Sequence, residues 1–241
     1  MSELGGYRAV ITGGASGIGF ATARMLTERG ASVFVIDRSP CEAFPAAQAD
    51  LSKAAEVEAA MARAAERLGG IDILVNSAGI DLEAATETVA DEDWDRVLSV
   101  NLSGPMRAAR AAFAHLAASG RGAVVNVSSG AGLRPIPDRA AYCASKAGLV
   151  MLSKSLALDW AEEGIRVNTV CPGAVHSDLF DQAWKTFPDP EARLAEIRER
   201  YALKRIAQAE ELAEAITFLA GPTARHITGS TLAVDGGRTF H

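Results

Sequence analysis

Cysteine and histidine are scarce in this sequence. The three cysteines are odd in number, and neither they nor the four histidines have the spacing of metal ligands. We therefore expect no metal site. Scattered, reduced thiols are typical of a cytoplasmic protein, and that is the location we predict.

Charge and hydrophobic length exclude two further classes of protein. The 24 basic and 30 acidic residues give a net charge of −6 without any long run of one sign, which argues against a nucleic-acid partner. No apolar stretch reaches the roughly 18 residues that span a bilayer. The first residues, MSELGGYRAVITGG, lack the charged and then apolar pattern of a secretion signal. We expect neither a membrane nor a nucleic acid as partner.

Short apolar runs alternate with longer helical patterns along the 241 residues. Helical patterns lie near residues 17–29, 53–68, 91–118, 140–163 and 210–220. The alternation predicts one α/β domain over residues 1–241, a doubly wound Rossmann fold with helices on both faces of a parallel sheet. Six apolar runs are interpreted as its buried strands: Ala9–Ile11, Val33–Ile36, Ile71–Val75, Ala123–Val127, Arg166–Val170 and Leu232–Val234.

Two segments depart from this alternation. Arg38–Ala49 contains two prolines and is too short for a crossover helix, so we expect a loop or one short turn there. Between Pro172 and Arg205 roughly thirty residues are inserted, with a helix predicted from Asp189–Pro190 to Arg200. Because such an insertion follows the carboxyl end of a strand, we predict a substrate-binding lid near residues 178–205.

A glycine-rich turn, TGGASGIG at residues 12–19, connects the first predicted strand to a helix. Gly13 permits a sharp turn, Gly17 removes a Cβ where a pyrophosphate approaches the backbone, and Gly19 allows close packing of the helix. The amino end of that helix presents free N–H groups to phosphates. The turn therefore predicts a dinucleotide site, and a tight turn without a ligand is the alternative.

Two residues at the end of the second strand bear on the choice of dinucleotide. Asp37 lies eighteen residues after Gly19, near the offset of a carboxylate that binds the adenosine ribose hydroxyls and repels a 2′-phosphate. Arg38 complicates this interpretation, since arginine can pair with a 2′-phosphate. We predict NAD as cofactor because Asp37 occupies the deciding position.

A candidate catalytic group follows in the second half of the chain. Tyr142 and Lys146 are four residues apart and share a helix face. An ammonium near a phenol stabilises the phenolate and so lowers the tyrosine pKa toward neutral. Lysine is scarce, with five among the 24 basic residues, so a lysine placed beside a tyrosine is stronger evidence for a functional pair. Ser129 follows a buried strand and can hydrogen-bond the same substrate oxygen as Tyr142. Each residue alone has a structural alternative, as a surface pair or a turn serine.

Together these motifs resemble the short-chain dehydrogenase/reductase family over nearly the whole chain. The residues that carry the resemblance are TGGASGIG at 12–19, Asp50-Leu51, Asn76-Ser77-Ala78-Gly79, Asn101, Ser129, Tyr142, Lys146 and Pro172-Gly173. Ser77 stands where the family has a second asparagine. The family's fold implies a seven-stranded parallel sheet, and its assembly implies a homotetramer. Its chemistry implies NAD(H)-dependent hydride transfer between a secondary alcohol and a ketone of a small molecule.

The resemblance also implies roles for single residues. Tyr142 is then the general acid/base, Ser129 orients the substrate oxygen, and Lys146 holds the nicotinamide ribose. Asn101 holds a water through its backbone carbonyl; the nearby Gly104-Pro105 also predicts a helix break there. The implied cofactor-binding residues are Gly13, Ser16, Gly17, Ile18, Gly19, Asp37, Arg38, Asp50, Leu51, Asn76, Ala78, Gly79, Tyr142, Lys146, Pro172, Gly173, Val175 and Ser177.

Two other functions remain as alternatives, and the substrate itself stays open. The first is a non-catalytic NAD-binding sensor on the same fold, which requires a broken catalytic set. The second is an epimerase or dehydratase that keeps its NAD bound, which usually needs a larger substrate domain. Residues outside the motifs would select the substrate, and the candidates are Gly130, Ala131, Arg139, His176 and the lid.

Overall fold

The structure is a computed structural model that describes residues 3–176 and 189–240. All strands in these residues belong to one sheet. Its seven strands are all parallel and lie in the order β3-β2-β1-β4-β5-β6-β7. The chain runs outward from β1 to β3 and returns beside β1 as β4. The strands are β1 Arg8–Thr12, β2 Ser32–Asp37, β3 Ala46–Gln48, β4 Ile73–Asn76, β5 Ala123–Val127, β6 Arg166–Pro172 and β7 Thr231–Val234.

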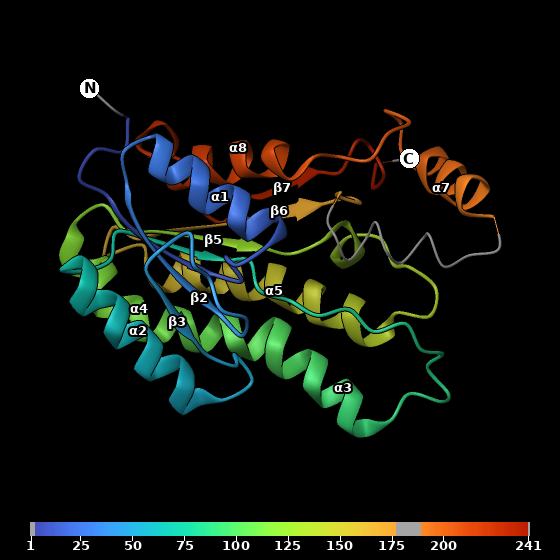
Figure 1. Cartoon of the computed structure of the whole chain (residues 1–241), viewed down its shortest axis with the longest axis horizontal. Helices are drawn as coiled ribbons and strands as arrows, with labels where there is room; N and C mark the ends of the chain where they lie inside the picture. Colours follow the sequence, from blue (N-terminus) through green and yellow to red (C-terminus); the bar gives the residue numbers. More distant parts are fainter. Residues whose placement is uncertain (1–2, 177–188, 241) are drawn as a thin grey trace.

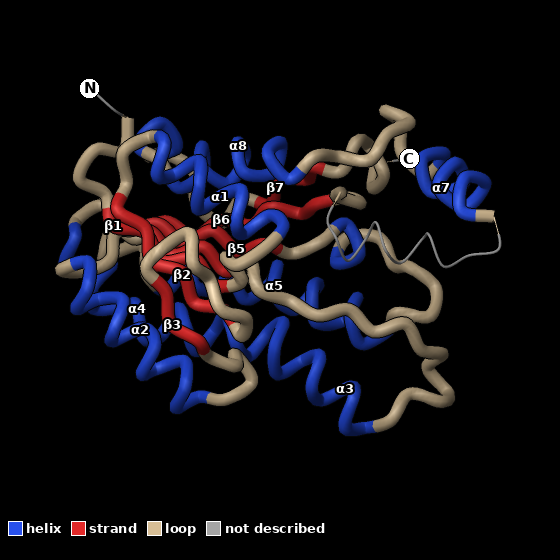
Figure 2. Tube along the Cα trace, viewed as in Figure 1, coloured by secondary structure: helices blue, strands red, loops and turns tan. Residues whose placement is uncertain are grey.

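Helices cover both faces of this sheet, as the doubly wound prediction requires (Figures 1 and 2). One face carries α1 (Gly17–Glu28) and α8 (Ala209–Ala220), which pack against each other. The other carries α2 (Ala54–Leu68), α4 (Gly104–Ser119) and α5 (Ala140–Asp159). Two further helices are α3 (Asp91–Leu98) and α7 (Pro190–Glu199). No helix in the described part of the chain is long and apolar enough to cross a membrane.

The core is divided by the sheet into two apolar layers. Val10, Leu74 and Val124 face the layer of α2 and α4, whereas Ile11 and Val75 face the layer of α1 and α8. Because successive side chains of a strand point to opposite faces, both alternating sets must be apolar. This explains why the strands appear in the sequence as continuous apolar runs.

Two predicted elements need correction, and two others are observed as predicted. The segment Arg38–Ala49, expected to be a loop, contains β3, which pairs with β2 through three residues; as an alanine-rich edge strand it lacks an apolar run. The helical pattern near 91–118 is interrupted, as Asn101 and Gly104-Pro105 predicted, and comprises α3, a π-helical turn at Ser99–Ser103 and α4. The helix expected near 140–163 ends at Asp159. The helix predicted from Asp189–Pro190 is α7, where the Asp189 side chain accepts from the amide of Ala192.

A buried ion cluster lies at the amino ends of the strands, opposite the predicted site. Asp72 is fully buried and accepts hydrogen bonds from the guanidinium groups of Arg8 and Arg121. Burial alone would raise the pKa of Asp72, but these hydrogen bonds outweigh it and hold the pKa below its ordinary value. Arg121 also stacks 4.0 Å from the centre of the Tyr7 ring.

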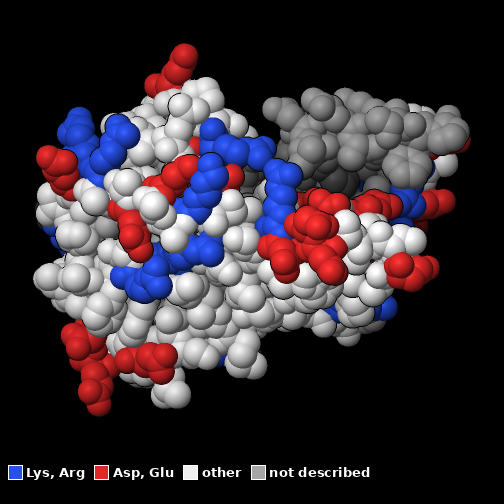
Figure 3. Space-filling model, turned by 90° about the horizontal axis from the view of Figure 1, so that it is seen from below, with Lys and Arg blue, Asp and Glu red and all other residues white. Residues whose placement is uncertain are grey.

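The charged side chains on the face seen in Figure 3 form small groups of both signs rather than one extended field. Ion pairs between neighbouring helices include Arg24 with Glu210 and Arg110 with Glu58. Exposed pairs of this kind contribute little to stability. The cohesion of the fold therefore comes mainly from the two apolar layers.

Candidate active site

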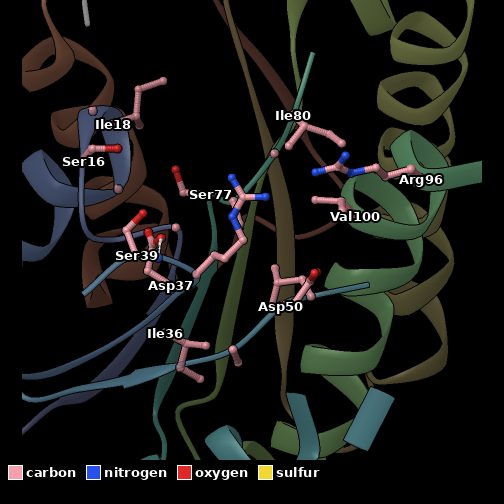
Figure 4. Close-up of a pocket in the computed structure, with 18 of the residues that line it drawn as sticks. Ser16, Ile18, Ile36, Asp37, Ser39, Asp50, Ser77, Ile80, Arg96 and Val100 are labelled. Carbon is pink, nitrogen blue, oxygen red and sulfur yellow. Dashed lines mark hydrogen bonds between the residues drawn. The ribbon is translucent and has the colours of Figure 1, made fainter. Parts of the chain in front are cut away.

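A cavity of about 420 Å³ opens at the carboxyl ends of β1, β2 and β4, where the strand order reverses. Ligands of open α/β sheets bind at this topological position. In Figure 4, Asp37 and Ser39 line one side of the cavity, and Arg96 and Val100 reach toward it from the opposite side. The predicted cofactor residues that line it are Gly13, Ser16, Gly17, Ile18, Gly19, Asp37, Arg38, Asp50, Leu51, Ala78, Gly79 and Val175.

The glycine-rich turn has the backbone geometry of a phosphate cradle. Gly17 begins α1 with φ +54°, and a Cβ at this position would meet no atom within 4 Å, so the space beside it is open. A Cβ on Gly19 would lie 2.0 Å from the carbonyl oxygen of Gly13. Gly19 therefore packs against the turn itself, whereas the sequence predicted packing against the sheet. The positive φ favours glycine at position 17, and the lack of space for a Cβ requires glycine at position 19. The amino end of α1 faces the cavity.

The carboxylate of Asp37 is held in place at the end of β2. One oxygen accepts from the amide of Ala15 at 3.0 Å, and the other accepts from the amide of Ser39 at 2.9 Å. A carboxylate offers about four acceptor positions, so each oxygen retains capacity for a ribose hydroxyl. Asp50 lies across the cavity; its pKa is lowered by hydrogen bonds from Ser52, with smaller contributions from Lys53 and Arg38.

Among the described residues, three predicted cofactor residues besides Tyr142 and Lys146 do not line the cavity. Asn76 is buried between strands: its amide donates to the Asn126 side chain at 2.8 Å, and its oxygen accepts from Thr12. This joins β1, β4 and β5, and the role of Asn76 in cofactor binding stays a prediction. Pro172 and Gly173 lie at the end of β6, where Gly173 bonds to Val234. Ser177 lies outside the described residues, as does the lid up to residue 188.

Tyr142 and Lys146 lie on α5, beside the end of β5 where Ser129 begins a short turn. The Lys146 ammonium lies 5.7 Å from the centre of the Tyr142 ring and donates to the carbonyl of Val127 at 3.0 Å. The Ser129 oxygen accepts from the amide of Ala131 and interacts with the Tyr142 hydroxyl. A strand end and a helix start thus bring the three predicted groups together, thirteen and four residues apart in sequence.

Burial controls the ionisation of this group. It raises the pKa of Tyr142, against an opposing hydrogen bond with Ser129. It also lowers the pKa of Lys146 to about 8, because the side chain is 4% exposed. The sequence predicted that Lys146 would lower the tyrosine pKa. In the structure, removal of the phenol from water dominates, and the ammonium is directed to the Val127 carbonyl.

Asn101 lies in the π-helical turn between α3 and α4 and is fully buried. Its side chain holds Ile80 twice, accepting from the amide and donating to the carbonyl, both at 2.8 Å. Pro105, four residues later, has no N–H, so the Asn101 carbonyl lacks its usual α-helical partner. The predicted helix interruption is therefore observed, and it lies next to Lys146: both groups border Gly79.

Comparison with known proteins places this geometry in a family. The family model described as enoyl-(acyl carrier protein) reductase matches residues 13–239. The chain is 38% identical to D-threitol dehydrogenase of Mycolicibacterium smegmatis, covering 99% of this chain and 95% of the relative. The solved ligand-free aldohexose dehydrogenase of Thermoplasma acidophilum matches with a TM-score of 0.94 and 31% identity, covering 100% and 96% of the two chains.

The chain belongs to the short-chain dehydrogenase/reductase family. It is an oxidoreductase that interconverts a secondary alcohol and a ketone of a small molecule with a nicotinamide cofactor. A further relative is named inactive 2-(S)-hydroxypropyl-CoM dehydrogenase 2 from Xanthobacter autotrophicus, 40% identical over 90% of this chain and 99% of the relative. Sequence identity of this order therefore does not distinguish an active dehydrogenase from a protein named as inactive. The argument for activity rests on the residues of the site.

Sequence reasoning missed several residues of this dehydrogenase's site. Ile36, Ser39, Ala49 and Ser77 are direct neighbours of predicted residues, so the motifs themselves pointed to their positions. Arg96 and Val100 come from α3 and the π-helical turn, and Ile80 follows the NSAG motif. Arg139, a candidate for substrate selection, forms ion pairs with two carboxylates of the chain, Asp81 and Glu83.

Proposed function

We propose that this dehydrogenase uses NAD(H) and that Tyr142 is its general acid/base. The observation that carries the proposal is the grouping of Tyr142, Ser129 and Lys146 at the end of β5, adjacent to a dinucleotide cavity that contains Asp37. The residues fit the cofactor. Gly17 leaves space at the amino end of α1 for a pyrophosphate, and the Asp37 carboxylate retains acceptor capacity for ribose hydroxyls.

In the oxidative direction, Tyr142 removes the proton of the alcohol as the carbinol carbon loses its hydride. The Ser129 hydroxyl donates a hydrogen bond to the substrate oxygen and orients it. Lys146 holds the ribose nearest the reacting carbon, and the Asn101 carbonyl holds a water that connects Lys146 to solvent. Bound NAD⁺ supplies the hydride acceptor. Ketone reduction follows the same steps in reverse.

The preference for NAD rests on Asp37, whose negative charge opposes a 2′-phosphate. Arg38 and Arg96 also line the cavity and carry the opposite charge. Asp37 outweighs them in this proposal because two backbone amides fix its carboxylate at the strand end, where the ribose hydroxyls of a dinucleotide lie in this fold.

We further propose a cytoplasmic homotetramer. The three cysteines are free thiols, as in reducing compartments. The outer face of α5 exposes Met151 and Leu158, which are 61% and 80% accessible. Apolar side chains this exposed on one helix suit a subunit interface. Light scattering after size-exclusion chromatography should give four times the mass of one 25.2 kDa chain.

The function is tested by a panel of secondary alcohols, polyols, hydroxy acids and cyclic diols, each offered with NAD⁺ and with NADP⁺ while the absorbance of the reduced nicotinamide is followed. We expect turnover with NAD⁺ on one class. Tyr142→Phe should reduce kcat by at least about a thousandfold and leave NADH binding, followed by fluorescence, nearly unchanged. Retained turnover in this variant refutes the assignment of Tyr142. Silence of the wild-type protein on every class, with NADH still bound, supports the non-catalytic sensor.

A further inference from the structure

Outside the residues already assigned, one charged cluster lies next to Tyr142. Arg139, the residue that precedes α5, forms ion pairs with both Asp81 and Glu83 in the loop after β4. Its side chain is 24% exposed, whereas Asp81 and Glu83 are 43% and 63% exposed. The guanidinium thus lies between two carboxylates, and the cluster joins segments more than fifty residues apart in sequence.

Backbone contacts also join the loop after β4 to the residues that precede α5. Ala84 pairs with Arg139 in an isolated parallel bridge, and its amide donates to the carbonyl of Asp138 at 2.8 Å. Asp138 has φ +57°, in the left-handed region that few residues other than glycine adopt. A conformation of this kind persists only where surrounding contacts hold it, and here these contacts come from the loop after β4.

The same loop also connects to Tyr142 through the interior. Ile80, which precedes Asp81, is held twice by the side chain of Asn101. The Asn101 amide donates to the Ser145 hydroxyl at 3.1 Å, and that hydroxyl donates to the Tyr142 carbonyl at 2.7 Å. The loop is therefore fastened on both sides of the Tyr142 turn of α5, by Arg139 before it and by Ser145 after it.

We propose that Arg139 and Asp81 form a positioning clamp that holds the Tyr142 turn of α5 against the loop after β4 and sets the electrostatic field at the tyrosine hydroxyl. The proposal rests on the proposed role of Tyr142. Because the Arg139 guanidinium is paired with Asp81 and Glu83, we assign it to positioning rather than to the substrate selection considered for it from the sequence. Because the two charges have opposite signs, their removal should move the ionisation of Tyr142 in opposite directions.

The charged and polar groups around Tyr142 are consistent with this reasoning. Ser129 faces it from the end of β5, Asp81 from the loop after β4, and Arg139, Cys143 and Lys146 from α5. After burial and the Ser129 hydrogen bond, Asp81 raises the pKa of Tyr142 and Arg139 lowers it. Asp81 also acts on Lys146, in the direction that favours the ammonium.

The test compares Asp81→Asn, Arg139→Gln and Arg139→Lys with Glu83→Gln as matched control. Glu83 shares Arg139 with Asp81 but is the more exposed carboxylate, so solvent screens its charge more. The measurement is the pH dependence of kcat/KM for oxidation of an alcohol that the panel identifies. At a fixed pH on the acid limb, kcat/KM is expressed relative to each variant's own plateau. We expect this ratio to rise about threefold in Asp81→Asn and to fall about threefold in Arg139→Gln. Glu83→Gln should move the limb much less.

The plateau value of kcat/KM reports how well Tyr142 is positioned, whereas the pH of the acid limb reports the effect of the neighbouring charges on Tyr142. Both Asp81→Asn and Arg139→Gln should lower the plateau, because the turn loses its clamp. Arg139→Lys should keep the position of the limb and recover only part of the plateau, since lysine retains the charge without the planar fork. Limbs that move in the same direction, or that do not move at all, overturn the proposal and indicate a merely structural ion pair.

A readout without turnover makes a failure of the clamp distinguishable from a failure of the proposed function. The chain has three tyrosines, so labelling their ζ carbons for NMR gives three resonances, and Tyr142→Phe identifies one. The titration of that resonance should shift to lower pH in Asp81→Asn and to higher pH in Arg139→Gln. If no alcohol is oxidised, the proposed function fails, and this titration alone decides for or against the clamp.

Discussion

Replacement of Lys146 by methionine should make the protein more stable while it removes activity. The ammonium is buried, and its pKa is lowered from 10.5 to about 8. That difference corresponds to about 3 kcal/mol by which the fold disfavours the charged lysine. Methionine keeps the apolar stem and removes the charge, but it leaves the Val127 carbonyl without its donor, which costs about 1–2 kcal/mol. The net expectation is a gain of about 1–2 kcal/mol in the free energy of unfolding.

The pH dependence gives the sharper test. Below pH 8 the lysine is charged in both the folded and the unfolded protein, so the wild-type protein carries the whole penalty. Between about pH 8 and 10.5 the unfolded chain binds a proton that the folded protein does not, so wild-type stability rises with pH. The advantage of Lys146→Met should therefore be largest at pH 7 and shrink toward pH 10.

The assay is urea unfolding of both proteins without cofactor, at equal protein concentration and at several pH values. A variant that is less stable than the wild type at pH 7 would refute the reasoning, as would an advantage that does not change with pH. Either result would mean that the ammonium is better solvated or better paired in the folded protein than its burial indicates.

Three further outcomes are expected. Asp72→Asn should lower the free energy of unfolding by about 3–5 kcal/mol at pH 7, because Arg8 and Arg121 lose a buried partner; urea unfolding measures this. In the wild type, the stabilisation from Asp72 is present above its unfolded pKa near 4 and is lost as pH falls through the lower folded pKa, so the gap between the two proteins should narrow in acid. Asp37→Ala should reduce the preference for NAD over NADP by about 10–100-fold in kcat/KM, and an unchanged ratio would assign the choice to another residue. Because the pKa of Tyr142 is raised, alcohol oxidation should become faster toward alkaline pH and ketone reduction toward neutral pH; an oxidation rate independent of pH would contradict a phenol as the base.

Sequence reasoning found β1, β2, β4, β5 and β6, which are largely buried on both faces, and also the more exposed edge strand β7 from its short apolar run. Val10 and Ile11 enter opposite apolar layers, so burial itself produces the continuous run that marks β1. β3 has no such signal, because Ala46 to Gln48 lie in the edge strand of the sheet and are defined by pairing with β2. A short edge strand that is defined by its pairing with a neighbouring strand leaves little trace in its own residues.

The same distinction applies to the site. Local motifs predicted the glycine-rich turn, Asp37 and the Tyr142–Lys146 pair, since each depends on spacing within one turn or one strand end. The motif did not indicate that the Asn76 side chain is buried and joins neighbouring strands.

The sequence by itself determined the doubly wound fold and the reactive groups, because period-two burial, glycine conformations and i, i+4 spacing are local properties. Only the tertiary structure decided what surrounds those groups. The raised pKa of Tyr142, the lowered pKa of Lys146 and the pairing of Arg139 with Asp81 arise from burial and from contacts between separate elements. Ionisation depends on every neighbour within a few ångströms, and those neighbours come from four different parts of the chain.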